Sequence, residues 1–79
     1  MKIEKLNITE KQKNNIKGWL KFTKLKPKSL HLDKFGNIYK TGYSEVTNLQ
    51  ITFRIFENGL CDMEGRNINL NEYELIHEF

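Results

Sequence analysis

The sequence predicts a single α+β domain spanning residues 1–79, in which one amphipathic helix packs on a small antiparallel sheet of four to five strands. Three observations lead to this prediction: a capping box before one helical stretch, a segment of alternating apolar and polar residues, and Gly- and Asn-containing turns between short apolar runs. No repeat and no Gly/Ser/Pro-rich linker divides the chain.

The helix is predicted by its N-terminal signal. Residues 1–8 are apolar at imperfectly alternating positions, which predicts a short first strand or an extended arm. Thr9 and Gln12 then have the spacing of a capping box, in which each side chain bonds the backbone amide of the other residue. We therefore expect the helix to begin at Glu10.

The interior and the end of the helix follow from spacing. Ile16, Trp19 and Leu20 lie at i, i+3 and i+4 and form one apolar stripe, with Lys residues mostly on the opposite side. Pro27 disfavours helical geometry in the residue before it, so the helix should end within residues 22–24.

The remaining segments alternate as strands do. Residues 30–32 and 38–39 flank turn-forming residues 33–37, which predicts a hairpin. The clearest strand covers residues 49–57, and Asn58-Gly59 predicts a two-residue turn with both residues at positive φ, followed by a return strand at 60–64. In the strand 49–57, one face has Leu49, Ile51, Phe53 and Ile55, and the other has Gln50, Thr52, Arg54 and Phe56.

The last residues support two readings. Residues 72–79 alternate as in a strand, yet Asn71 and Glu74 form a capping-box pattern with Leu70 and Leu75 as its hydrophobic staple. We expect a short terminal helix here, with a strand as the alternative.

The charge of the chain is divided between its halves. Residues 1–40 contain eleven Lys against three acids, a net charge of +8, whereas residues 41–79 contain two Arg against seven acids, a net charge of −5. Frequent Lys, Asn and Ile with no Ala indicate an AT-rich genome, which raises Lys content without confining it to one half. The asymmetry predicts a dipolar molecule whose two ends meet different partners.

The acidic half combines carboxylates with aromatic side chains, which suits a protein interface. Phe56 is exposed if the sheet buries one face only, and covered if a helix packs on its second face. We expect a non-enzymatic protein that covers a functional surface of a host protein, as phage or mobile-element inhibitors of nucleic-acid-handling or defence systems do. The candidate binding residues are Arg54, Phe56, Glu57, Asp62, Glu64 and Tyr73.

The alternative is a small basic nucleic-acid-binding protein. Nine Lys lie between Lys11 and Lys40 with aromatic residues among them, a composition that neutralises phosphates. This half has no Arg for bidentate contacts to guanine, so the pattern indicates nonspecific contact only. The candidate residues are Lys13, Lys17, Lys21, Lys24, Lys26 and Lys28.

Enzymatic chemistry is the third and least favoured hypothesis. A hydrolase could be built on Cys61 or His77, but the acidic neighbours of Cys61 do not stabilise a thiolate, and a domain this short has little room for a deep active site. His31, Asp33 and His77 are too scattered to predict a metal site. We therefore expect no catalytic residues, no cofactor and no metal.

Localisation and assembly complete the expectations. The chain has one cysteine, no apolar run of bilayer-spanning length and no apolar stretch near residue 1, which predicts a cytoplasmic protein without membrane association. A thin core also makes a homodimer a reasonable expectation.

Overall fold

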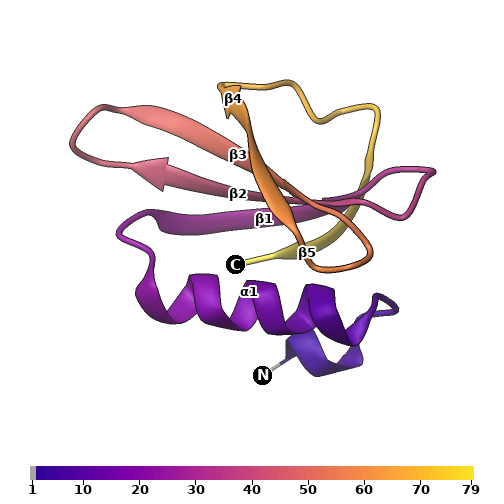
Figure 1. Cartoon of the computed structure of the whole chain (residues 1–79). Coiled ribbons are helices and arrows are strands. Elements are labelled where there is room, and N and C mark those ends of the chain that lie inside the picture. The colour runs from indigo at the N-terminus through magenta and orange to yellow at the C-terminus, as the bar shows by residue number, and fades with distance from the viewer. Residues whose placement is uncertain (1) are drawn as a thin grey trace.

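The computed structural model describes residues 2–79 and confirms the predicted α+β class. A 3₁₀ helix and an α-helix precede five strands, which form one antiparallel sheet in the order β4-β3-β2-β1-β5, with α1 packed on one face (Figure 1). The elements are η1 (Lys2–Lys5), α1 (Glu10–Phe22), β1 (Lys26–Leu32), β2 (Ile38–Ser44), β3 (Leu49–Ile55), β4 (Cys61–Arg66) and β5 (Glu74–Glu78).

The predicted bounds of the helix are confirmed. Thr9 Oγ1 accepts a hydrogen bond from the Gln12 amide at 3.1 Å, and Gln12 Oε1 accepts one from the Thr9 amide at 3.0 Å, so the capping box is complete. The helix ends at Phe22, where extended geometry at Thr23 begins the connection to β1. The stripe is directed at the sheet, with Ile16 fully buried.

The expected N-terminal strand or extended arm is wrong. Residues 2–5 form η1, and Met1 lies outside the described residues. The amide of Leu6 donates to the carbonyl of Ile3 at 3.1 Å, which brings two apolar residues three positions apart onto one side of a tight turn. Ile3 is thereby fully buried, and Leu6 and Ile8 pack against the core, which a strand of alternating sides would not achieve.

The expected C-terminal helix is also wrong, since residues 74–78 form β5. This strand pairs antiparallel with β1, placing Glu78 opposite Ser29 and Glu74 opposite Leu32. Pairing satisfies backbone groups of both segments and packs Ile76 against the core, two gains that a short solvent-facing helix lacks.

The hairpin turn between β3 and β4 differs from the prediction by one residue. The Gly59 amide donates to the carbonyl of Phe56, and the Phe56 amide donates to the carbonyl of Leu60, both at 2.8 Å. Gly59 has φ 88°, whereas Asn58 keeps negative φ. The connection is therefore a three-residue loop with a bulge at Gly59. This loop length sets Arg54 opposite Asp62.

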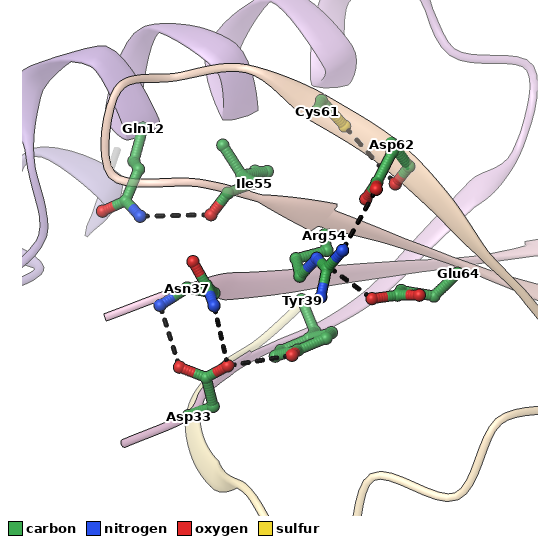
Figure 2. Close-up of polar contacts among 9 residues, drawn as sticks. All are labelled: Gln12, Asp33, Asn37, Tyr39, Arg54, Ile55, Cys61, Asp62 and Glu64. Carbon is green, nitrogen blue, oxygen red and sulfur yellow. Dashed lines mark hydrogen bonds and ion pairs between the residues drawn. The ribbon is translucent and has the colours of Figure 1, made fainter. Parts of the chain in front are cut away.

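A buried polar side chain joins the helix to both hairpins. Gln12 is 1% exposed, and its Nε2 donates to the carbonyl of Gly36 at 2.8 Å. The same Nε2 donates to the carbonyl of Ile55 at 3.2 Å (Figure 2). The apolar core lies around it and consists of Ile3, Ile16, Leu30, Ile38 and Ile55.

The sheet face away from α1 is covered in part by the segment between β4 and β5 (Figure 1). This segment is attached to β3, because the Asn67 amide donates to the Gln50 carbonyl at 2.7 Å and Asn67 Oδ1 accepts from the Gln50 amide at 3.0 Å. Thr41 and Thr52 are consequently fully buried and lie 3.2 Å apart through their hydroxyls. A loop, rather than the helix considered from the sequence, forms the second layer.

Candidate functional site

Arg54 is the centre of a polar and aromatic cluster on the face away from α1. Its Nη2 donates to Asp62 Oδ2 at 3.1 Å, and its Nε lies 3.1 Å from Glu64 Oε1 without a hydrogen bond (Figure 2). Its Cζ lies 4.6 Å from the centroid of the Phe56 ring, a stacking distance. The structure therefore brings together four of the six residues predicted from the sequence.

The electrostatics of this cluster keep Arg54 charged. The hydrogen bond to Asp62 raises the pKa of Arg54, and Glu64 adds to that effect against a smaller opposing contribution from burial. Two carboxylates share this one guanidinium, so the cluster carries a net charge of −1. Arg54 remains 31% exposed, so the pairs are accessible to solvent and to a partner.

Tyr73, another predicted binding residue, lies beside the cluster in a stack with Tyr39. The two rings are 4.6 Å apart between centroids and 4° from parallel. Tyr39 is buried, and its hydroxyl donates to Asp33 Oδ2 at 2.9 Å. Burial and the neighbouring Asp33 carboxylate raise the pKa of Tyr39 above its ordinary value. The stack thus has one fixed ring, Tyr39, and one half-buried ring, Tyr73.

Asp33 holds this arrangement in place, and the sequence reasoning missed that role. Its Oδ1 accepts from the amides of Phe35 and Asn37 at 2.8 and 2.9 Å, and its Oδ2 accepts from Asn37 Nδ2 at 3.0 Å in addition to Tyr39. Burial alone would raise the pKa of Asp33, but the hydrogen bonds from Asn37, Tyr39 and Phe35 outweigh burial and lower it. The signal was present as an Asp and an Asn four residues apart in a turn.

A cleft of about 530 Å³ opens next to the stack. Its lining includes Asp33, Tyr39, Tyr73 and Arg54, and Phe35 at its rim is 71% exposed. The cleft is thus bordered by aromatic rings and one guanidinium, side chains that dominate binding energy at protein interfaces.

Glu57 lies apart from the other predicted residues. It is in the turn between β3 and β4, where its carbonyl accepts from Thr9 Oγ1 at 2.8 Å and its side chain lies against Gly36. Although Glu57 follows Phe56 in the chain, these contacts are with the N-terminus of α1 and the turn before β2 and not with Arg54.

The predicted nucleic-acid-binding lysines are spread over α1, the connection that follows it and the start of β1, and several have partners. Lys17 pairs with Glu4, and Lys26 Nζ lies 3.0 Å from Glu45 Oε1. Lys13 Nζ lies 3.5 Å from a Glu10 oxygen and donates to the Glu4 carbonyl. Lys28 donates to Gln50 at 3.1 Å, while Lys21 and Lys24 are exposed. Carboxylates therefore offset much of the positive charge of this set.

The residues considered for catalysis or metal binding are dispersed. Cys61 is an exposed free thiol at the start of β4, and burial lowers the pKa of His31 on β1. Within residues 2–79, no group of three or more His, Cys, Asp or Glu side chains is placed to hold a metal ion.

No protein family, no curated protein and no solved structure matches the chain. In the described part of the chain, neither helix is long and apolar enough to cross a membrane.

Proposed function

We propose that this chain is a non-enzymatic cytoplasmic binding protein that covers a functional surface of a host protein. The binding face is that of the Arg54 cluster and the Tyr39–Tyr73 stack. The biological role that fits is an inhibitor, encoded by a phage or mobile element, of a nucleic-acid-handling or defence system.

One observation carries the proposal: Arg54, Phe56 and Tyr73 gather on one face beside an open cleft. Arg and aromatic residues contribute most of the binding energy at protein interfaces when they are well packed before binding. Here Arg54 is held by two carboxylates and a ring, and Tyr73 by Tyr39, so little side-chain freedom is lost on association.

The test is affinity capture from a lysate of the natural host, with half of the lysate treated with nuclease. The wild type should retain one host protein at near one-to-one stoichiometry in both halves. The double variant Phe56→Ala/Tyr73→Ala should lose it while its circular dichroism spectrum remains that of the wild type. Phe22→Ala, at the exposed end of α1, is the matched control and should bind normally.

The same affinity capture distinguishes protein binding from the alternative, nucleic-acid binding. If nuclease removes every partner, the lysine-rich surface is the functional one and the protein-binding proposal fails. Binding that persists in the Phe56→Ala/Tyr73→Ala variant would keep the protein partner but reject this face.

A further inference from the structure

β4 ends the sheet on one side, and the edge it presents is open. No strand of the described residues pairs with its outer side, and its first three residues are exposed. Leu60 and Met63, at and next to this edge, are 66% and 63% exposed. An open edge with exposed apolar side chains is a template for another strand.

The ladder fixes which backbone groups of β4 are free. The Phe56 amide donates to the Leu60 carbonyl, so this pair is a hydrogen-bonded one. Hydrogen-bonded and non-hydrogen-bonded pairs alternate along an antiparallel ladder, which makes Arg54–Asp62 bonded and Phe53–Met63 non-bonded. The amide and carbonyl of Met63 therefore point outward, toward an incoming strand.

The two faces of this edge differ in chemistry. Met63 lies opposite Phe53 on the sheet face on which α1 packs, and its apolar side chain is exposed. Asp62 and Glu64 lie on the other face, where Arg54 neutralises only one of the two charges. A complementary strand therefore has apolar side chains on the Met63 face and basic side chains on the Asp62–Glu64 face.

A second copy of the chain does not meet this requirement in the registers that centre on Asp62 or Met63. Antiparallel self-pairing centred on Met63 places Asp62 opposite Glu64, and pairing centred on Asp62 places Asp62 opposite its own copy. Pairing centred on Glu64 opposes the two copies of Glu64 but also sets Asp62 opposite Arg66. Like charges directly opposite each other are destabilising. Self-pairing in the registers centred on Asp62 or Met63 is therefore disfavoured, whereas a basic strand in the same registers meets opposite charges.

We propose that β4 binds an extended segment of the partner protein by strand addition, with alternating basic and apolar residues in that segment. This inference rests on the proposed function and adds the chemistry of the bound segment. Main-chain hydrogen bonds at Met63 would contribute to affinity. The difference between the apolar and the acidic face would determine the register of the bound segment along β4.

The test uses the ¹⁵N-labelled full chain and two synthetic peptides, one alternating Lys and Val and one alternating Glu and Val. Titration with the Lys–Val peptide should shift amide resonances along β4 and slow hydrogen exchange of the Met63 amide, whereas the Glu–Val peptide should bind at least tenfold more weakly. Equal effects of both peptides, or shifts confined to other elements, would overturn the proposal.

Two variants separate backbone pairing from charge. Met63→Pro removes the outward amide and should weaken the Lys–Val peptide about tenfold relative to Met63→Ala, which retains that amide. The double variant Asp62→Asn/Glu64→Gln should abolish the preference for Lys over Glu and covers the case in which Met63→Pro does not fold. Peptide binding without host capture would reject the proposed function alone, and host capture by Met63→Pro at wild-type strength would reject strand addition alone.

Discussion

Replacing Asp33 tests the network that positions the Tyr39–Tyr73 stack. Asp33→Ala removes four hydrogen bonds, two from backbone amides, one from Asn37 Nδ2 and one from the buried Tyr39 hydroxyl. Each bond contributes about 0.5–1.5 kcal/mol net. Water can replace the acceptor at the exposed amides, so we expect a loss of about 2–3 kcal/mol, or roughly 10–20 °C in Tm for a domain of this size.

The assay is urea unfolding followed by circular dichroism and by the fluorescence of Trp19, the single tryptophan. Asp33→Asn is the matched control, because it keeps an acceptor oxygen for the two backbone amides and should lose only about 1 kcal/mol. A change below about 0.5 kcal/mol in Asp33→Ala would refute the reasoning that this carboxylate organises the turn.

The same residue predicts a pH dependence. The folded-state pKa of Asp33 lies below its ordinary value of 3.8, so the unfolded chain binds the proton first as the pH falls. Its contribution is complete above that value and is lost as the pH falls through the folded-state pKa. The advantage of the wild type over Asp33→Asn in unfolding free energy should therefore shrink below pH 3.8, and parallel profiles would contradict this.

Three further changes are measured by the same unfolding assay. Gly42→Ala should cost about 1–3 kcal/mol, because its Cβ would lie 2.8 Å from Leu25 Cβ and 3.1 Å from Trp19 Cζ2; an unchanged midpoint would contradict this. Gly18→Ala meets nothing within 4 Å and should stabilise α1 by about 0.5–1 kcal/mol, so a loss of stability would count against it. Lys40 is 5% exposed and burial lowers its pKa below 10.5, so the wild type should gain stability relative to Lys40→Met as the pH rises toward 10.5, and a constant difference would reject this.

The sequence predicted those elements that are determined by residues close together in the chain, such as α1. Thr9 and Gln12 gave both the start and the cap of α1, because a capping box involves residues three positions apart. The helix predicted for residues 72–79 was wrong because their structure depends on residues far away in the chain. Asn71 and Glu74 mimic a helix start, but the pairing that decides their structure is with β1, more than 40 positions away.

The residues of the Arg54 cluster could be predicted from the sequence, but their geometry could not. A two-residue turn at Asn58-Gly59 would have placed Arg54 opposite Met63, whereas the three-residue loop places it opposite Asp62. One residue of loop length thus decides which side chains share a face. The covering segment between β4 and β5 had no sequence signal, so the full burial of Thr41 and Thr52 could not be predicted from the pattern.

The side-chain amide of Gln12 allows only one position of α1 on the sheet. Apolar contacts between α1 and the sheet tolerate sliding or rotation of a helix, because they have no preferred direction. The two carbonyls that Gln12 Nε2 reaches belong to different hairpins, and one helix position satisfies both. Displacement by one turn would bury three polar groups without partners. The two hydrogen bonds of Gln12 therefore fix the position of α1 on the sheet, and with it the position of the Arg54 face relative to the helix.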